Sequence, residues 1–221
     1  MESLTPEELR VVACLAEKQL TTPDSYPLTQ NALVAACNQL SNRNPVVSYD
    51  DNTVRLTLTS LRAKQLARVI HIPGGRVPKH RHILDEALGL ERGELALLAV
   101  LTLRGPQTVG ELRIRTERMH EFADLSEVEE VLERLAARPE PLVVRLERQP
   151  GQKEWRYAHL LGGPISAETL ATWESELPAP AAPYLASTAG GPDAADRLAA
   201  LEARVAAIEA ELGISPPAAP E

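Results

Sequence analysis

The 221-residue sequence has few aromatic residues, which make up 3% of it, so Leu, Val, Ile and Ala must build its hydrophobic core. It has no apolar run of about 18 residues, which excludes a membrane-spanning helix by hydropathy. The opening MESLTPEELR has neither the basic nor the apolar segment of a signal peptide, so we expect a cytoplasmic protein without a membrane partner. Its two cysteines, Cys14 and Cys37, lie in apolar helical patterns and are expected to be buried thiols.

Signatures of catalysis and of cofactor binding are also missing. The sequence contains no glycine-rich phosphate loop, nucleophile elbow or Cys/His zinc pattern. His80 and His82 would share one side of a strand, a spacing that can ligate a metal, but no third ligand is near in sequence. We therefore expect a non-enzymatic protein that uses no cofactor and no metal.

Charge is distributed unevenly along the chain, whose net charge is −8. Residues 1–84 contain ten Lys and Arg against seven Asp and Glu, a balance of +3. Residues 85–160 have eleven against fifteen, and residues 161–221 have two against nine. If the partner is a nucleic acid, the first third of the chain is the better candidate to bind it.

Three helices and a two-stranded hairpin are predicted in this first third. Thr5 is expected to begin the first helix as the N-cap of a capping box. The third helix follows Asp50 and Asp51, which are suited to cap it. Strands at Leu66–Ile72 and Val77–Leu84, joined by a glycine turn, complete the order of a winged helix.

The same order is predicted a second time. A very apolar helix at Glu91–Leu103 is followed by helices that capping boxes open at Thr108 and Ser126. Strands at Leu142–Leu146 and Glu154–His159 form the second hairpin. The predicted fold is therefore mainly α with small β-wings (α+β), an architecture duplicated within one chain.

These patterns divide the chain into five segments. They are a winged-helix domain at 1–84, a second at 85–163, a short helix and Ala/Pro-rich linker at 164–192, a short coiled-coil-like helix at 193–213 and a disordered tail at 214–221.

The C-terminal helix has an apolar seam with alternating steps of three and four, formed by Leu198, Leu201, Val205, Ile208 and Leu212. A parallel homodimer would set arginines against glutamates on either side of this seam. The alternative is that the helix packs back on its own chain, and the sequence leaves both open.

The third helix and the hairpin of the first unit are the main functional candidate. A winged helix commonly lays this helix in the major groove of DNA and its wing along the backbone. The predicted nucleic-acid contacts are Asn42, Arg43, Arg55, Thr59, Arg62, Lys64, Arg76, Lys79 and Arg81.

The corresponding helix of the second unit is acidic. It exposes Glu127, Glu130 and Glu133, and carboxylates repel phosphate, so we expect it to pack or to bind a partner protein. A basic cluster on the preceding helix is expected to pair with these carboxylates; its members are Arg113, Arg115 and Arg118.

Four stretches of the sequence resemble the YceH-like family of uncharacterised bacterial proteins. They are TTPDSYPLTQNALVAACNQLSNRNP at 21–45, GRVPKHRH at 75–82, GELRIRTERMHEF at 110–122 and PGQKEWRYAHLL at 150–161. The resemblance covers about residues 4–163 and implies two tandem winged-helix domains in a cytoplasmic bacterial protein, with no established activity. Leu40 stands where the family tends to have Lys, which lowers the basic potential at that turn, and Asn44 where it tends to have Asp.

Two functions are compatible with these observations. The first is a DNA-binding module, with a regulatory role, that contacts double-stranded DNA through its first unit. The second is a protein-assembly adaptor, similar to the ScpB-type partners of chromosome-organising complexes, that touches no nucleic acid. A regulator that responds to a small molecule is a third hypothesis, for which the sequence shows no pocket. Whether Asn42 and Arg43 meet a phosphate, a second protein or the protein's own backbone stays open.

Overall fold

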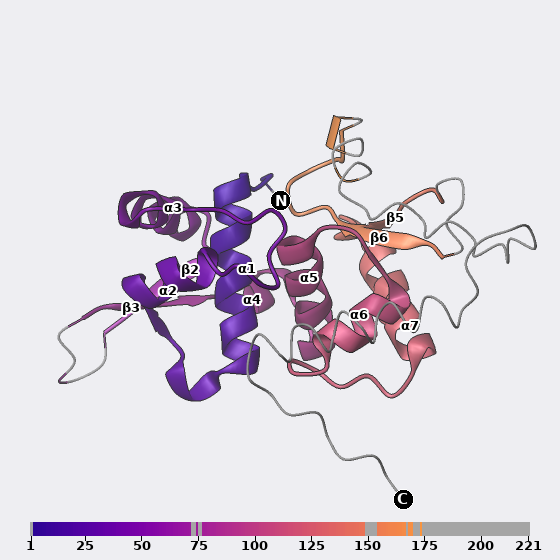
Figure 1. Cartoon of the computed structure of the whole chain (residues 1–221), viewed down its shortest axis with the longest axis horizontal. Coiled ribbons are helices and arrows are strands. Elements are labelled where there is room, and N and C mark those ends of the chain that lie inside the picture. The colour runs from indigo at the N-terminus through magenta and orange to yellow at the C-terminus, as the bar shows by residue number, and fades with distance from the viewer. Residues whose placement is uncertain are drawn as a thin grey trace, which may run out of the picture. The chain divides into compact units, whose positions relative to one another are not determined.

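The computed structural model describes residues 2–71, 74, 77–148, 154–166, 168, 169 and 173 (Figure 1). Its elements in chain order are α1 (Pro6–Thr21), η1 (Pro23–Ser25), β1 (Leu28–Thr29), α2 (Gln30–Cys37), α3 (Asp51–Ala63), β2 (Ala67–Ile70), β3 (Lys79–His82), α4 (Leu84–Leu88), α5 (Arg92–Arg104), β4 (Gln107–Thr108), α6 (Val109–Thr116), α7 (Leu125–Ala136), β5 (Val143–Arg145) and β6 (Arg156–His159). This confirms a mainly α fold with small antiparallel sheets.

The order helix, short strand, two helices and hairpin occurs twice. The two sheets have the orders β1-β3-β2 and β4-β6-β5, so in each the last strand of the hairpin lies in the middle. The outer strands β1 and β4 have two residues each and lie directly before α2 and α6. The division of this duplicated order into two domains stays a prediction, because the described elements fall within one compact unit.

Local capping chemistry determines where most helices begin. Thr5 and Thr108 each accept a hydrogen bond from the N3 backbone in a complete capping box, as the sequence predicts for α1 and α6. Asp50 caps α3 through Thr53 N. The prediction for α7 was wrong: the N-cap is Asp124, whose side chain accepts from Glu127 N, because Asp is a strong N-cap two positions before Ser126.

The hydrophobic core is continuous between the two repeats because α1 and α5 pack against one another (Figure 1). Val11–Ala16 in α1 and Leu95–Leu101 in α5 are buried without interruption. A helix buried on every side needs no polar stripe, which explains the very apolar sequence of α5. Cys14 and Cys37 are buried free thiols in this core, as predicted.

The C-terminal predictions lie mostly outside the described residues. The linker, the coiled-coil-like helix with its five seam residues and the tail belong to this part of the chain, and the dimer stays a prediction. Among the helices that the structure describes, none has the length and hydropathy to span a bilayer. The cytoplasmic location stays a prediction.

Candidate nucleic-acid interface

Helix α3 presents one polar face to solvent. Val54, Leu58 and Leu61 are buried beneath it, while Arg55 and Arg62 are exposed. Asn52 and Thr59 are exposed on the same helix, so the predicted face is present as a surface. Arg55 donates to Asn52 Oδ1 over 2.6 Å, and the Thr59 hydroxyl donates to the Arg55 carbonyl over 3.0 Å. These bonds are local to α3 and leave its face open to solvent.

The outer face of the first sheet is also basic. In the antiparallel pair β2–β3, Arg68 lies opposite Arg81 and Ile70 opposite Lys79. Arg81 and Arg68 both contact Glu86, at 2.5 and 3.5 Å. This face therefore carries three cations, Arg68, Lys79 and Arg81, and one carboxylate, Glu86.

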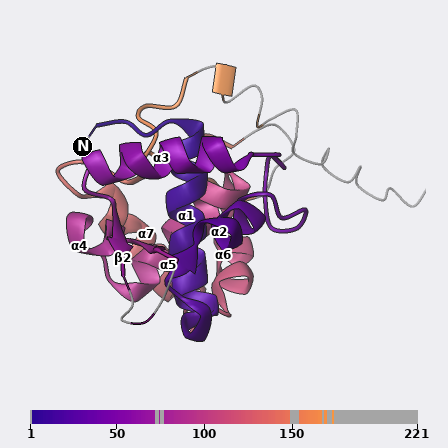
Figure 2. The ribbon, with the colours of Figure 1, turned by 90° about the vertical axis from the view of Figure 1, so that its left-hand side faces the viewer.

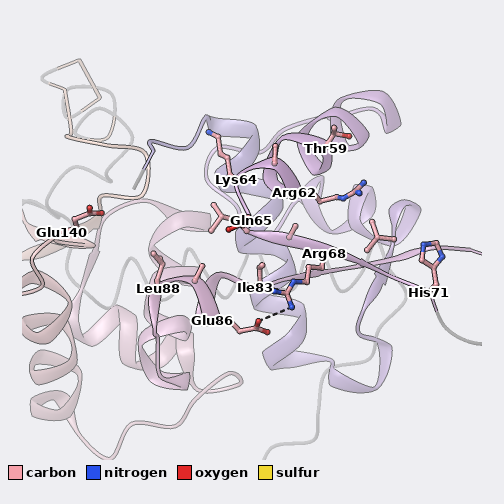
Figure 3. A pocket seen from close by; sticks show the side chains of 15 residues that line it. Thr59, Arg62, Lys64, Gln65, Arg68, His71, Ile83, Glu86, Leu88 and Glu140 are labelled. Carbon is pink, nitrogen blue, oxygen red and sulfur yellow. Dashed lines mark ion pairs between the residues drawn. The ribbon is translucent and has the colours of Figure 1, made fainter.

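A cleft of about 1250 Å³ lies between α3, β2 and α4 (Figure 3). Arg62 reaches over it from the C-terminal turn of α3, and Arg68 and His71 reach it from β2 and the residue that follows. Glu86 and Glu140 also line it. The structure thus brings three predicted contacts, Thr59, Arg62 and Lys64, together with two basic residues that were not predicted, Arg68 and His71.

The outward direction of Arg68 follows from the alternation of inward and outward side chains along β3. His80 and His82 are buried, and residues facing each other across an antiparallel pair share a side of the sheet. The outward Arg81 therefore places its cross-strand partner Arg68 outward too. That partner depends on the hairpin register, which the sequence reading did not assign.

Lys64 also lines the cleft, but its ammonium group is paired with a carboxylate of α1. Its ammonium group lies 2.9 Å from Glu8 Oε2, and Ser60 donates to the other oxygen of the same carboxylate over 2.6 Å. Burial raises the pKa of Glu8, but the hydrogen bonds from Ser60, Lys64 and Thr5 outweigh it and lower that pKa. These contacts fasten α3 across the N-terminal end of α1 (Figure 2). Lys64 therefore contributes to packing, and its contact with a nucleic acid stays a prediction.

Arg43 lies inside the protein, with a fully buried side chain. Two of its nitrogens donate to Glu17, over 3.0 and 2.6 Å, and its Nε donates to the Ala36 carbonyl over 3.1 Å. Burial lowers the pKa of Arg43, but the hydrogen bonds to Glu17, together with the electrostatic influence of Cys14, Glu17 and Cys37, outweigh burial and raise that pKa. No phosphate can reach this guanidinium, so we withdraw Arg43 as a nucleic-acid contact. Its partner is the protein's own chain.

Asn42 is exposed but faces the second repeat. It has a φ of 61°, in the left-handed region that Asn tolerates better than most residues. Its Oδ1 accepts a hydrogen bond from Arg104 at the end of α5. Two residues later, Asn44 N donates to the carbonyl of Leu103 in the same helix over 2.7 Å. Asn42 therefore belongs to the junction between the repeats.

The two histidines of β3 face the core on one side, as the strand pattern predicts. Burial lowers the pKa of His82 to about 4, and burial and the charge of Arg62 lower that of His80. Within the described residues, no three His, Cys, Asp or Glu side chains are grouped to hold a metal. Arg76, the remaining predicted contact, lies outside the described residues.

The basic cluster of α6 does not pair as expected with the acidic helix of its own repeat. Arg115 lies 3.3 Å from Glu111 on its own helix, and Arg113 donates to the Ala123 carbonyl. On α7, Glu130 and Glu133 are exposed, which leaves an acidic surface there. The spacing along α6 allows an i to i+4 pair, and this local pair forms instead.

Comparison with known proteins places these features in a family. A family model described as a protein of unknown function, DUF480, matches residues 4–152. The chain belongs to the DUF480 family. Similar DUF480-type relatives are UPF0502 proteins from Pelobacter propionicus, 52% identical over 96% of this chain and 92% of the relative, and from Geotalea uraniireducens, 55% identical over 92% and 89%. Another, from Geobacter metallireducens, is 59% identical over 73% of each chain. The motif resemblance to the YceH-like uncharacterised proteins agrees with this membership.

Proposed function

We propose that the protein is a non-enzymatic, winged-helix DNA-binding protein that contacts duplex DNA through α3 and the outer face of the β2–β3 hairpin. The observation that supports this most is the placement of cations. In the first repeat, Arg43 and Lys64 are held by Glu17 and Glu8 inside or beside the core. On α3 and the β2–β3 hairpin, by contrast, Arg55, Arg62 and Arg68 are exposed, and Lys79 and Arg81 are partly exposed.

The charge pattern also defines how DNA would approach. The N-terminal turn of α3 carries Asp50 and Asp51, which repel phosphate. Arg55 and Arg62 lie further along the helix, and Arg62 shares the cleft with Arg68 (Figure 3). We therefore infer that the backbone of the duplex lies along the middle and C-terminal part of α3 and crosses the hairpin.

Fluorescence anisotropy with a random 25-base-pair duplex tests this proposal. About four phosphate contacts predict a slope of log affinity against log salt of roughly −4. Changing Arg62→Gln with Lys79→Gln is expected to reduce the slope to roughly −2. Arg134→Gln is the matched control, since Arg134 is exposed near the end of the corresponding helix α7 and is expected to leave binding unchanged. No binding of the unaltered chain at 50 mM salt would refute the proposal.

One observation favours the second candidate, a protein-assembly adaptor. Leu56 lies on α3 beside Arg55 and is 54% exposed. An exposed apolar side chain can be buried in the apolar core of a protein interface. Under this alternative, Leu56→Ser abolishes capture of a partner from nuclease-treated extract and Arg62→Gln with Lys79→Gln does not. Loss of duplex affinity in Arg62→Gln with Lys79→Gln, but not in Leu56→Ser, supports DNA binding instead.

A further inference from the structure

A second basic cleft, of about 500 Å³, lies at the junction of the two repeats. Its walls come from the C-terminal half of α1, the turn at 39–42, the end of α5 and α6 with the residues just after it. Within the part of the chain that the structure describes, α3 and the β2–β3 hairpin contribute none of its lining, so it is separate from the proposed DNA surface. Two stretches that carry the family resemblance, 21–45 and 110–122, meet here although they are distant in sequence.

The lining of this junction cleft is strongly cationic. Lys18, Arg104, Arg115 and Arg118 line it against one lining carboxylate, Glu17, so the lining residues have a net charge of +3; Glu111, which pairs with Arg115, lies outside the lining. The Glu17 carboxylate is itself occupied, because both of its oxygens accept hydrogen bonds from the buried Arg43.

Arg104 is the central cation of the junction cleft. Its guanidinium donates to Asn42 Oδ1, a neutral acceptor that cannot balance its charge. Burial and then the positive charge of Arg115 lower the pKa of Arg104 by more than Glu17 and Glu111 raise it. An anion that lies beside Arg104 favours its charged form.

The walls of the cleft are held in place before any ligand arrives. The turn is anchored to α5 by the bond from Asn44 N to the Leu103 carbonyl and to α1 by Arg43 and Glu17. Residues with hydroxyl or amide side chains, among them Ser41, provide uncharged hydrogen-bonding groups in the lining. Preorganised cations with neutral donors favour a ligand that has several charged oxygens.

We propose that the junction cleft binds a small molecule that carries a diphosphate or triphosphate group. The volume lies in the range of sites for small molecules and cofactors, and the net charge of +3 matches a ligand with about three negative charges. Arg104 and Arg115 clamp the phosphate oxygens from α5 and α6, while Lys18 approaches from α1. This proposal is independent of DNA binding, because the two surfaces share no lining residue.

Isothermal titration of the full chain with inorganic pyrophosphate, ATP and AMP tests the proposal. Pyrophosphate and ATP are expected to bind with 1:1 stoichiometry, and AMP at least about tenfold more weakly because it has fewer charges. Arg104→Gln and Arg115→Gln are each expected to weaken pyrophosphate binding by about tenfold or more, the effect of losing a charge-assisted hydrogen bond. Arg113→Gln is the matched control, since Arg113 is exposed on the same helix but donates to the Ala123 carbonyl outside the cleft.

A gain-of-affinity variant keeps the test decisive if the arginine variants fold poorly. Leu40 lines the cleft and is 84% exposed, so Leu40→Lys adds a cation at the rim without disturbing the core. Leu40→Lys is expected to bind pyrophosphate severalfold more tightly than Leu40→Gln. The proposal is overturned if neither pyrophosphate nor ATP binds at millimolar concentration, if Arg113→Gln weakens binding as much as Arg115→Gln, or if Leu40→Lys and Leu40→Gln bind equally.

Discussion

The buried pair of Arg43 and Glu17 leads to a prediction that separates a structural residue from a DNA contact. Replacing Arg43 with Met keeps much of the side chain's volume but removes its charge and its hydrogen bonds. If Arg43 acted on DNA from the surface, the substitution would lower affinity and leave stability nearly unchanged. Its buried position predicts the opposite result.

The size of the effect follows from the groups that Arg43→Met leaves behind. The Glu17 carboxylate, whose side chain is 12% exposed, loses two hydrogen bonds and keeps only Lys18, at 3.5 Å. The Ala36 carbonyl loses its bond to Arg43 Nε inside the core. Breaking a buried ion pair from one side costs about 3–5 kcal/mol, and we expect a loss of this size in the free energy of unfolding.

A double-mutant cycle with urea unfolding, followed by far-ultraviolet circular dichroism, measures the loss. Glu17→Met alone is expected to destabilise by a similar amount, because it leaves the buried guanidinium unpaired. The double variant, which removes both charges, should be more stable than the sum of the two single effects predicts, by roughly 2 kcal/mol or more. Arg55→Met is the control, since an exposed arginine changes stability by about 0.5 kcal/mol at most.

Two results would refute this reasoning. The first is an Arg43→Met variant within about 1 kcal/mol of the unaltered protein, which is less than a broken buried pair costs. The second is additivity of the two single effects, which would mean that Arg43 and Glu17 do not interact. In the folded fraction of Arg43→Met, the duplex affinity and its salt slope should be unchanged.

Three further predictions concern stability. Burial lowers the pKa of His82 and of His159 to about 4, below the unfolded value near 6.5, so the unfolded chain binds more protons between these values. The free energy of unfolding should therefore be fully retained above pH 6.5 and should fall on acidification, by up to roughly 3 kcal/mol per histidine at pH 4. A urea midpoint that does not change from pH 7 to pH 5 contradicts this prediction. Asp124→Ala should cost about 1 kcal/mol in the same assay and Ser126→Ala almost nothing, which tests the N-cap of α7. Leu132→Ala should cost roughly 2–5 kcal/mol by leaving a core cavity, detected as a lower melting temperature.

The helices were predictable because their signals are local. A capping box and an apolar periodicity lie within a few residues of each other, and at Thr5 and Thr108 the structure has the helix starts that these patterns predict. Strands β1 and β4 were not predicted, because their formation depends on residues that are distant in sequence. Two residues are too few to show an alternation, and these strands exist only because β3 and β6 provide backbone partners far along the chain.

The candidate site was only partly predictable, because exposure depends on distant residues. Arg55 and Arg62 could be placed from helical spacing, since the apolar positions of α3 define the opposite face. Arg43 has polar sequence neighbours typical of a surface turn, yet its side chain is buried because it pairs with Glu17 of α1, which is distant in sequence. The junction cleft could not be predicted at all, because its cations come from α1, α5 and α6, and no local pattern brings these helices together.

The hydrogen bond between the two ends of the duplicated body has a consequence for chain connectivity. Leu4 N donates to the Leu161 carbonyl over 3.0 Å, and a side chain placed at Gly163 would meet Ser3. The segments directly before α1 and after β6 are therefore in contact. Joining the two ends by a short linker and opening the chain at an exposed loop should preserve every strand pair. A circular permutant of this kind would change the order in which the repeats are synthesised without changing their architecture.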